Sequence, residues 1–170
     1  MHSIHSRRLP IVCTVLLMLL VSAITTSASA AQQSSVQNFI SYLEQENIRY
    51  TYEGVNDDGV ERLRISYELD HFGSLDCVLL FQDNDEVDLR IWNIVTSAAG
   101  KEKTVDLVNT LNASYKYVKF VFDENDSTVQ GEADMLIDAE HSAPQIFDAM
   151  ILMFSVIDDG DIAAQLHSLE

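Results

Sequence analysis

The sequence is poor in cysteine, which limits how the chain can be stabilised. It contains only Cys13 and Cys77, and Cys13 lies inside an apolar N-terminal segment described below. Without Cys13 no intrachain disulfide is possible, so stability must come from packing. Cys77 alternates with Leu75 and Leu79, a pattern typical of a small core residue and not of a nucleophile.

Basic residues are also scarce. Ten lysines and arginines face 27 aspartates and glutamates, and the formal net charge is −17. Loss of Arg7 and Arg8 with the N-terminal segment would take this charge to −19. A field of this sign repels nucleic acid and anionic membrane surfaces, and it favours solubility and cationic partners.

The patterns that carry catalysis are absent from the sequence. No glycine-rich phosphate loop is present, and no serine sits in a glycine elbow. His71, His141 and His167 are widely separated and lack the spacing of zinc ligands. We therefore predict that the protein is not an enzyme and has no catalytic residues, resident metal or cofactor.

The first thirty residues have the layout of a signal peptide. Arg7 and Arg8 precede the uncharged apolar run 9–24, and Ala28-Ser29-Ala30 fits the signal peptidase rule. A transmembrane helix needs about 20 apolar residues, and this run is shorter. We expect cleavage after Ala30, a periplasmic or secreted protein, and no stable membrane anchoring afterwards; the alternative is an uncleaved anchor.

Residues 31–170 suit a single domain. Apolar spacing predicts helices over 35–46, 101–111 and 143–157, with a short last helix over 162–169. Alternation predicts strands over 49–53, 60–69, 75–82, 87–95, 116–122 and 128–138. The order α-β-β-β-β-α-β-β-α, with short turns between strands, indicates an α+β fold whose antiparallel sheet carries its helices mainly on one face.

Two neighbouring strands have an apolar second side. Leu75, Cys77, Leu79 and Phe81 alternate on the core side of one, and Val87, Leu89, Ile91 and Val95 on that of the next. The opposite side should be polar, yet it would hold Val78, Leu80, Trp92 and Ile94. Either a helix of the same chain covers these four residues or they form a partner-binding patch, with tryptophan as a favoured anchor.

Acidic turns offer a second, weaker possibility. One cluster spans 83–88, and Asp123, Asn125 and Ser127 have the spacing that begins a calcium loop. The sixth position of that loop is Thr128 where glycine is expected, and a strand follows. Aspartate and asparagine are also common in turns for local hydrogen bonding, so the clusters favour turns over metal sites.

One stretch resembles a known family. Val108-Asn109-Thr110-Leu111-Asn112, followed by Tyr117-Val118-Lys119-Phe120 and an acidic turn, is similar to the YbjN-like family of bacterial sensory transduction regulators. The resemblance covers roughly 36–157. It implies a fold like that of type III secretion chaperones, which are small α+β proteins that dimerise and hold extended client segments. The resemblance supplies no catalytic residues.

Our leading hypothesis is a non-enzymatic, exported binding or chaperone-like regulator that acts through protein–protein contacts. Its partner would be a protein client or a second copy in a homodimer, held at Val78, Leu80, Trp92 and Ile94. The alternative is a small metal- or ligand-responsive periplasmic regulator that uses the acidic turn loops.

Overall fold

Six strands form one antiparallel sheet in the spatial order β1-β2-β3-β4-β6-β5. The computed structural model describes residues 34–82, 85–138 and 142–170. The predicted signal peptide, the predicted cut after Ala30, Asp83 and His141 lie outside these residues. The strands are β1 (Thr51–Val55), β2 (Glu61–Leu69), β3 (Gly73–Phe81), β4 (Glu86–Thr96), β5 (Lys119–Asp123) and β6 (Thr128–Leu136).

The helices follow the predicted positions within a few residues. They are α2 (Ser35–Gln45), α3 (Lys101–Ser114), α4 (Ser142–Ile157) and α5 (Gly160–His167). The Ser34 side chain caps α2 by accepting a hydrogen bond from the backbone N–H of Gln37. The Asp159 side chain caps α5 by accepting from the backbone N–H groups of Asp161 and Ile162. In the residues described, no helix is long and apolar enough to cross a membrane. The predicted α+β class is confirmed, with α5 as a fourth helix at the end.

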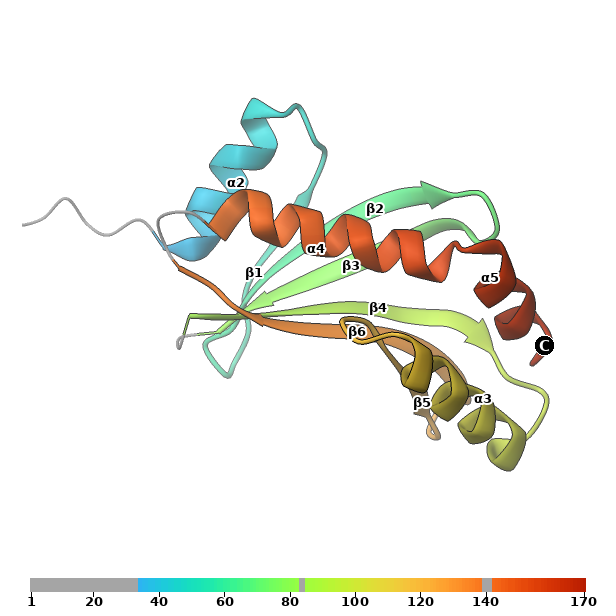
Figure 1. The fold of residues 1–170 in the computed structure, drawn as a ribbon. Helices are drawn as coiled ribbons and strands as arrows, with labels where there is room; N and C mark the ends of the chain where they lie inside the picture. The colour runs from blue at the N-terminus through green and yellow to red at the C-terminus, as the bar shows by residue number, and fades with distance from the viewer. Residues whose placement is uncertain (1–33, 83–84, 139–141) are drawn as a thin grey trace, which may run out of the picture. The chain divides into compact units, whose positions relative to one another are not determined.

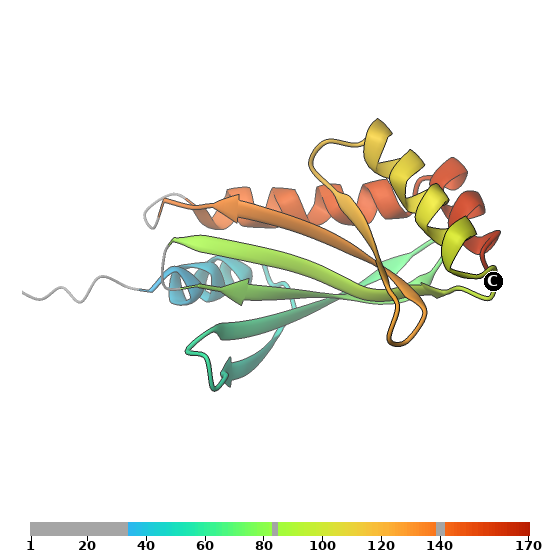
Figure 2. The ribbon, with the colours of Figure 1, turned by 90° about the horizontal axis from the view of Figure 1, so that it is seen from below.

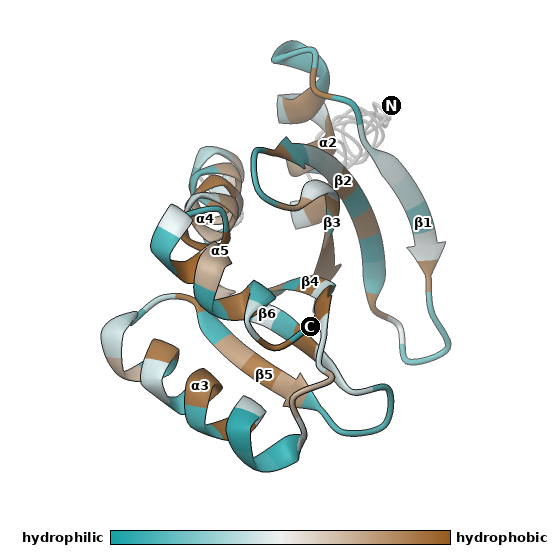
Figure 3. Cartoon of the chain, turned by 90° about the vertical axis from the view of Figure 1, so that its right-hand side faces the viewer, coloured by the Kyte–Doolittle hydropathy of each residue, from teal (hydrophilic) through white to brown (hydrophobic). Residues whose placement is uncertain are grey.

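Strand register places the predicted apolar sets in line with one another. Leu63 on β2 pairs with Leu79 on β3, Leu79 with Leu89 on β4, and Leu89 with Ala133 on β6. The first three side chains are fully buried. Figure 3 shows the resulting banding of hydrophobic and hydrophilic residues along β2. Side-chain alternation at these paired positions therefore builds the core as predicted.

One face of the sheet, called here the helix face, carries α2 and α4 (Figure 1). Phe39 of α2 lies 6.0 Å from Phe81 of β3 between ring centroids. Ile146, Met150, Met153, Phe154 and Ile157 of α4 are buried in the same core. Packing within the chain therefore accounts for the many apolar residues of the predicted helix over 143–157.

Tyr67 departs from the predicted pattern. Strict alternation predicts that Tyr67 lies with Leu63 and Ile65 on the core side of β2, but Tyr67 is 44% exposed. Its ring still stacks on Phe154 of α4, with 5.1 Å between centroids. Tyr67 therefore lies at the margin of the core, where a tyrosine can bury its ring and leave its hydroxyl in water.

The connection between α3 and β5 is held by the side chain of Asn112, which forms the two backbone hydrogen bonds that a neighbouring strand would form. The Asn112 amide donates to the Phe120 carbonyl oxygen at 2.8 Å, and its side-chain oxygen accepts from the Phe120 N–H at 2.8 Å. Phe120 pairs with Gly131 of β6 on its other side. One asparagine thus satisfies the outward-facing backbone groups of Phe120 on the edge strand β5.

Candidate functional site

The face of the sheet opposite α2 and α4 holds three of the four residues predicted to bind a partner. We call it the open face, and Figure 2 looks onto it. Val78 and Leu80 lie on β3, and Trp92 lies on β4. Val78 is fully buried, Leu80 is half-buried, and Trp92 is 37% exposed. Of these three, Trp92 presents the most apolar surface to a partner.

Ile94 does not lie on the open face. Between Ile91 and Val95 the pairing of β4 with β6 shifts register, and Asn93 adopts a left-handed backbone with φ 55°. This bulge turns Ile94 to the helix face, where its Cδ1 lies 3.4 Å from the position that a Cβ on Gly131 would occupy. The predicted placement of Ile94 was wrong because strict alternation does not hold across a β-bulge.

Arginine residues flank Val78 on both neighbouring strands. In the register of the sheet, Val78 lies between Arg64 on β2 and Arg90 on β4. Long arginine stems can cover apolar surface while their charged ends remain in water. The apolar patch predicted for this face is therefore narrower than the sequence suggested, and charged groups surround it.

The first charged group joins β1, β2 and β3. Arg64 contacts Glu53 at 2.6 Å and Asp76 at 2.8 Å, and Arg62 contacts Glu53 at 3.2 Å. Hydrogen bonds from the Ser66 hydroxyl and from Arg64 lower the pKa of Asp76 below its usual value. Asp76 is therefore a carboxylate at neutral pH and links β3 to β2, while Arg64 continues the connection to Glu53 on β1.

The second charged group joins β4 and β6. The Arg90 guanidinium lies 2.6 Å from Asp134, 3.7 Å from Asp88 and 4.0 Å from Glu132. Three carboxylates thus surround one cation, which leaves a local excess of negative charge. Sequence reasoning missed Arg90 because its partners become neighbours only through the register of β4 with β6.

Trp92 contacts Arg62, a member of the first charged group. The Arg62 Cζ lies 5.7 Å from the centroid of the Trp92 ring, within the range of a cation–π interaction. Arg62 also forms an ion pair with Glu53, which holds the guanidinium in place beside the indole ring. The arrangement presents a large, partly exposed aromatic side chain on a strand, beside a paired arginine, and tryptophan and arginine are both enriched in protein-binding sites.

The acidic turns show local hydrogen bonding. Asp123 accepts from the Asn125 backbone at 2.8 Å, and Asp126 accepts from the Thr128 backbone at 3.2 Å. Across residues 34–82, 85–138 and 142–170, no three His, Cys, Asp or Glu side chains are grouped so that they could hold a metal ion. These turns follow the local pattern that the residue types favour.

Cys77 and the histidines form no nucleophilic pair within the described structure. Cys77 is fully buried, and burial raises the pKa of its thiol to about 12. The thiol therefore stays protonated near neutral pH. His71 lies 3.1 Å from Asp158. His167, the last residue of α5, lies 2.7 Å from Glu170. Both histidines have structural partners.

Comparison with known proteins places the chain in a family. Residues 35–165 match the YbjN family, described as "Putative bacterial sensory transduction regulator". The chain belongs to the YbjN family. A search of curated proteins gave no match.

A solved structure shares the fold of this YbjN chain. It is described as "Crystal structure of YbjN, a putative transcription regulator from E. coli". The likeness has a TM-score of 0.51 and 14% sequence identity, and it covers 83% of this chain and 97% of that one. The family resemblance read from Leu111-Asn112 and the strand that follows is therefore confirmed, and the family is one of regulators and not a known enzyme family.

Proposed function

We propose that this YbjN protein is a non-enzymatic regulator that binds a client protein on its open face, with Trp92 as the central anchor. The observation that carries the proposal is the 37% exposure of Trp92 on a strand, beside the paired Arg62. Exposed tryptophans on rigid elements are frequent energetic centres of protein interfaces. Half-buried Leu80 adds apolar surface to the same face at its position opposite Asp88, and buried Val78 lies on the same strand.

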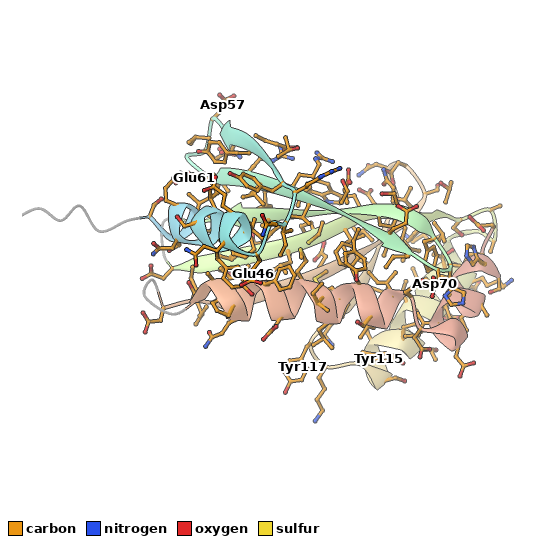
Figure 4. All side chains as sticks on the ribbon, turned by 90° about the horizontal axis from the view of Figure 1, so that it is seen from above. Glu46, Asp57, Glu61, Asp70, Tyr115 and Tyr117 are labelled. Carbon is orange, nitrogen blue, oxygen red and sulfur yellow. The ribbon has the colours of Figure 1, made fainter. Side chains whose placement is uncertain are left out.

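The charge of the chain selects the kind of client. Acidic residues lie at separate places around the surface, including Glu46, Asp57 and Asp70 (Figure 4). A second copy would carry the same strongly negative net charge and would be repelled at long range. A client with a basic contact surface is attracted by the same field, so we favour a basic client over a homodimer.

Trp92→Glu is expected to weaken client binding about thirtyfold, the effect of losing a central anchor. The new carboxylate can pair with Arg62, so the fold should survive. Clients are identified by affinity capture from periplasmic extract, and each purified client is then titrated calorimetrically against both chains. Trp92→Phe should stay within about threefold of the natural chain, because an aromatic ring is retained.

Leu152→Glu is the matched control, because Leu152 is 44% exposed on α4 and lies away from the open face. This variant should bind a client normally. Equal affinity of the Trp92→Glu and natural chains for every purified client would disprove the proposal, provided that circular dichroism shows both chains folded.

We also propose that the protein is exported, with residues 1–30 removed. The support is the layout of Arg7, Arg8, the apolar run 9–24 and Ala28-Ser29-Ala30. Intact mass measurement of the protein from the periplasmic fraction should give a chain that begins at Ala31. A chain that retains Met1 to Ala30 in the cytoplasmic fraction would contradict export.

A further inference from the structure

Strand β6 is longer than the strand that covers its outer side. Its residues from Thr128 to Glu132 pair with β5, and the register ends at the Lys119–Glu132 pair. On its other side, β6 pairs with β4 as far as Leu136. Among the residues described, no strand pairs with the outer edge of Ala133–Leu136. Figure 2 shows β6 running on past β5 in this way.

The alternation of the ladder shows where the backbone groups of this edge point. Phe120 directs its N–H and C=O outward to Asn112, so its partner Gly131 directs its own toward β4. In an antiparallel strand this direction alternates from one residue to the next. The N–H of Ile137 indeed donates to the Asp85 carbonyl at 2.8 Å. Asp134 and Leu136 therefore present their backbone N–H and C=O groups at the outer edge.

The other two edges of the sheet are protected. On β1, a bulge next to Gly54, whose φ is +87°, interrupts the pairing with β2. On β5, Asn112 occupies the outward groups of Phe120. Bulges and covering groups are the usual ways in which proteins prevent an edge from pairing with another strand. The β6 edge from Ala133 to Leu136 has neither a bulge nor a covering strand.

Side chains along this edge separate by face. Ala133 and Met135 point to the helix face and pack against the core while staying half-buried. On the open face, Glu132 and Asp134 surround Arg90 together with Asp88, and Leu136 is 80% exposed. An added strand would thus meet apolar groups on one side and excess negative charge on the other.

We propose that the β6 edge at Ala133–Leu136 binds an extended protein segment in which apolar residues alternate with lysine or arginine. The segment adds to the sheet as a further strand, with main-chain hydrogen bonds to Asp134 and Leu136. Its apolar residues lie beside Ala133 and Met135, and its basic residues face the carboxylates around Arg90. A second copy is a poorer occupant, because it would bring like charges together at this edge.

Leu136→Pro tests the edge directly. Proline removes the outward N–H of Leu136 and leaves the pairing of β6 with β4, since that N–H does not face β4. The probe is a fluorescent peptide of alternating lysine and valine, titrated against the full chain by anisotropy. We expect the natural chain to bind it with an affinity that falls with salt, and Leu136→Pro to bind it about tenfold more weakly.

Three comparisons separate edge pairing from other causes. Leu136→Ala keeps the backbone donor and should bind within about threefold of the natural chain. Methylating alternate backbone nitrogens of the peptide should abolish binding to the natural chain, whether or not Leu136→Pro folds. Trp92→Glu should leave peptide binding unchanged, so this inference and the proposed function can fail separately.

The proposal is overturned if the natural chain does not bind the lysine–valine peptide. It is also overturned if the methylated peptide, or an aspartate–valine peptide, binds equally well. Sedimentation that shows a dimer of the natural chain and a monomer of Leu136→Pro would assign the edge to a second copy instead, which equally overturns a basic client segment.

Discussion

Replacing Gly131 with valine is expected to lower the free energy of unfolding by about 3 kcal/mol, the upper range for overpacking a core. A Cβ at this position would lie 3.1 Å from the Ile157 Cδ1 and 3.4 Å from the Ile94 Cδ1. Valine would add two further methyl groups to this crowded space. The glycine thus allows α4 to pack closely over β6 and is required by contact rather than by backbone conformation.

A double-mutant cycle can show that Ile157 is the obstacle. Ile157→Val removes the Cδ1 atom nearest to Gly131, so Gly131→Val should cost less in that background. Urea unfolding followed by circular dichroism would give the four free energies. Equal costs in the two backgrounds, or a Gly131→Val chain as stable as the natural one, would show that α4 does not pack at this distance.

Asp158→Ala is expected to lower the free energy of unfolding by about 2–3 kcal/mol at neutral pH, because loss of the carboxylate leaves two backbone N–H donors without their acceptor. Asp158 follows α4 and accepts from the backbone N–H groups of Asp70 and His71, each at 2.9 Å. Its carboxylate also lies 3.1 Å from the His71 ring. This one side chain attaches the β2–β3 turn to the end of α4.

The stability contributed by Asp158 should depend on pH in a defined direction. Burial alone would raise its pKa, but the backbone donors of Asp70 and His71 and the His71 ring together lower it. A lowered folded-state pKa gives stability that is present above the unfolded-state value of about 3.9 and is lost as the pH falls below it. The stability difference between the natural and Asp158→Ala chains should therefore be present at neutral pH and should narrow as the pH falls below about 4.

Asp158→Asn serves as the control, because it keeps one side-chain oxygen as an acceptor but cannot ionise. Its stability difference from Asp158→Ala should change little with pH, since neither residue titrates. Urea unfolding of the three chains at several pH values measures these gaps, and the other acids cancel in the differences. A gap that widens as the pH falls would contradict the assigned role of Asp158.

Local patterns in the sequence were sufficient for most of the fold. Alternation in β2, β3 and β6 identifies the buried rows, and Val36, Phe39 and Leu43 identify the buried side of α2. These signals depend on one element at a time. The order of the strands cannot be predicted from one element at a time, because β6 lies between β4 and β5 through pairings of residues that are distant in the chain.

The open face was less predictable for the same reason. Trp92 breaks the polar pattern of β4, and that signal is visible in the sequence. The left-handed Asn93, which turns Ile94 away from Trp92, carries no signal strong enough to predict a bulge. The position of Val78 between two arginines likewise follows from the register of three strands and not from neighbours in the chain.

Asn112 restricts which residues can follow Leu111. The contact with Phe120 needs one donor and one acceptor on the same short side chain. Aspartate at neutral pH offers only acceptors, serine offers a single oxygen, and glutamine places its amide one methylene farther away. At position 112, asparagine alone supplies both bonds at this reach. The second residue of the Leu-Asn pair, through which the chain resembles its family, therefore cannot be replaced without losing a hydrogen bond to Phe120.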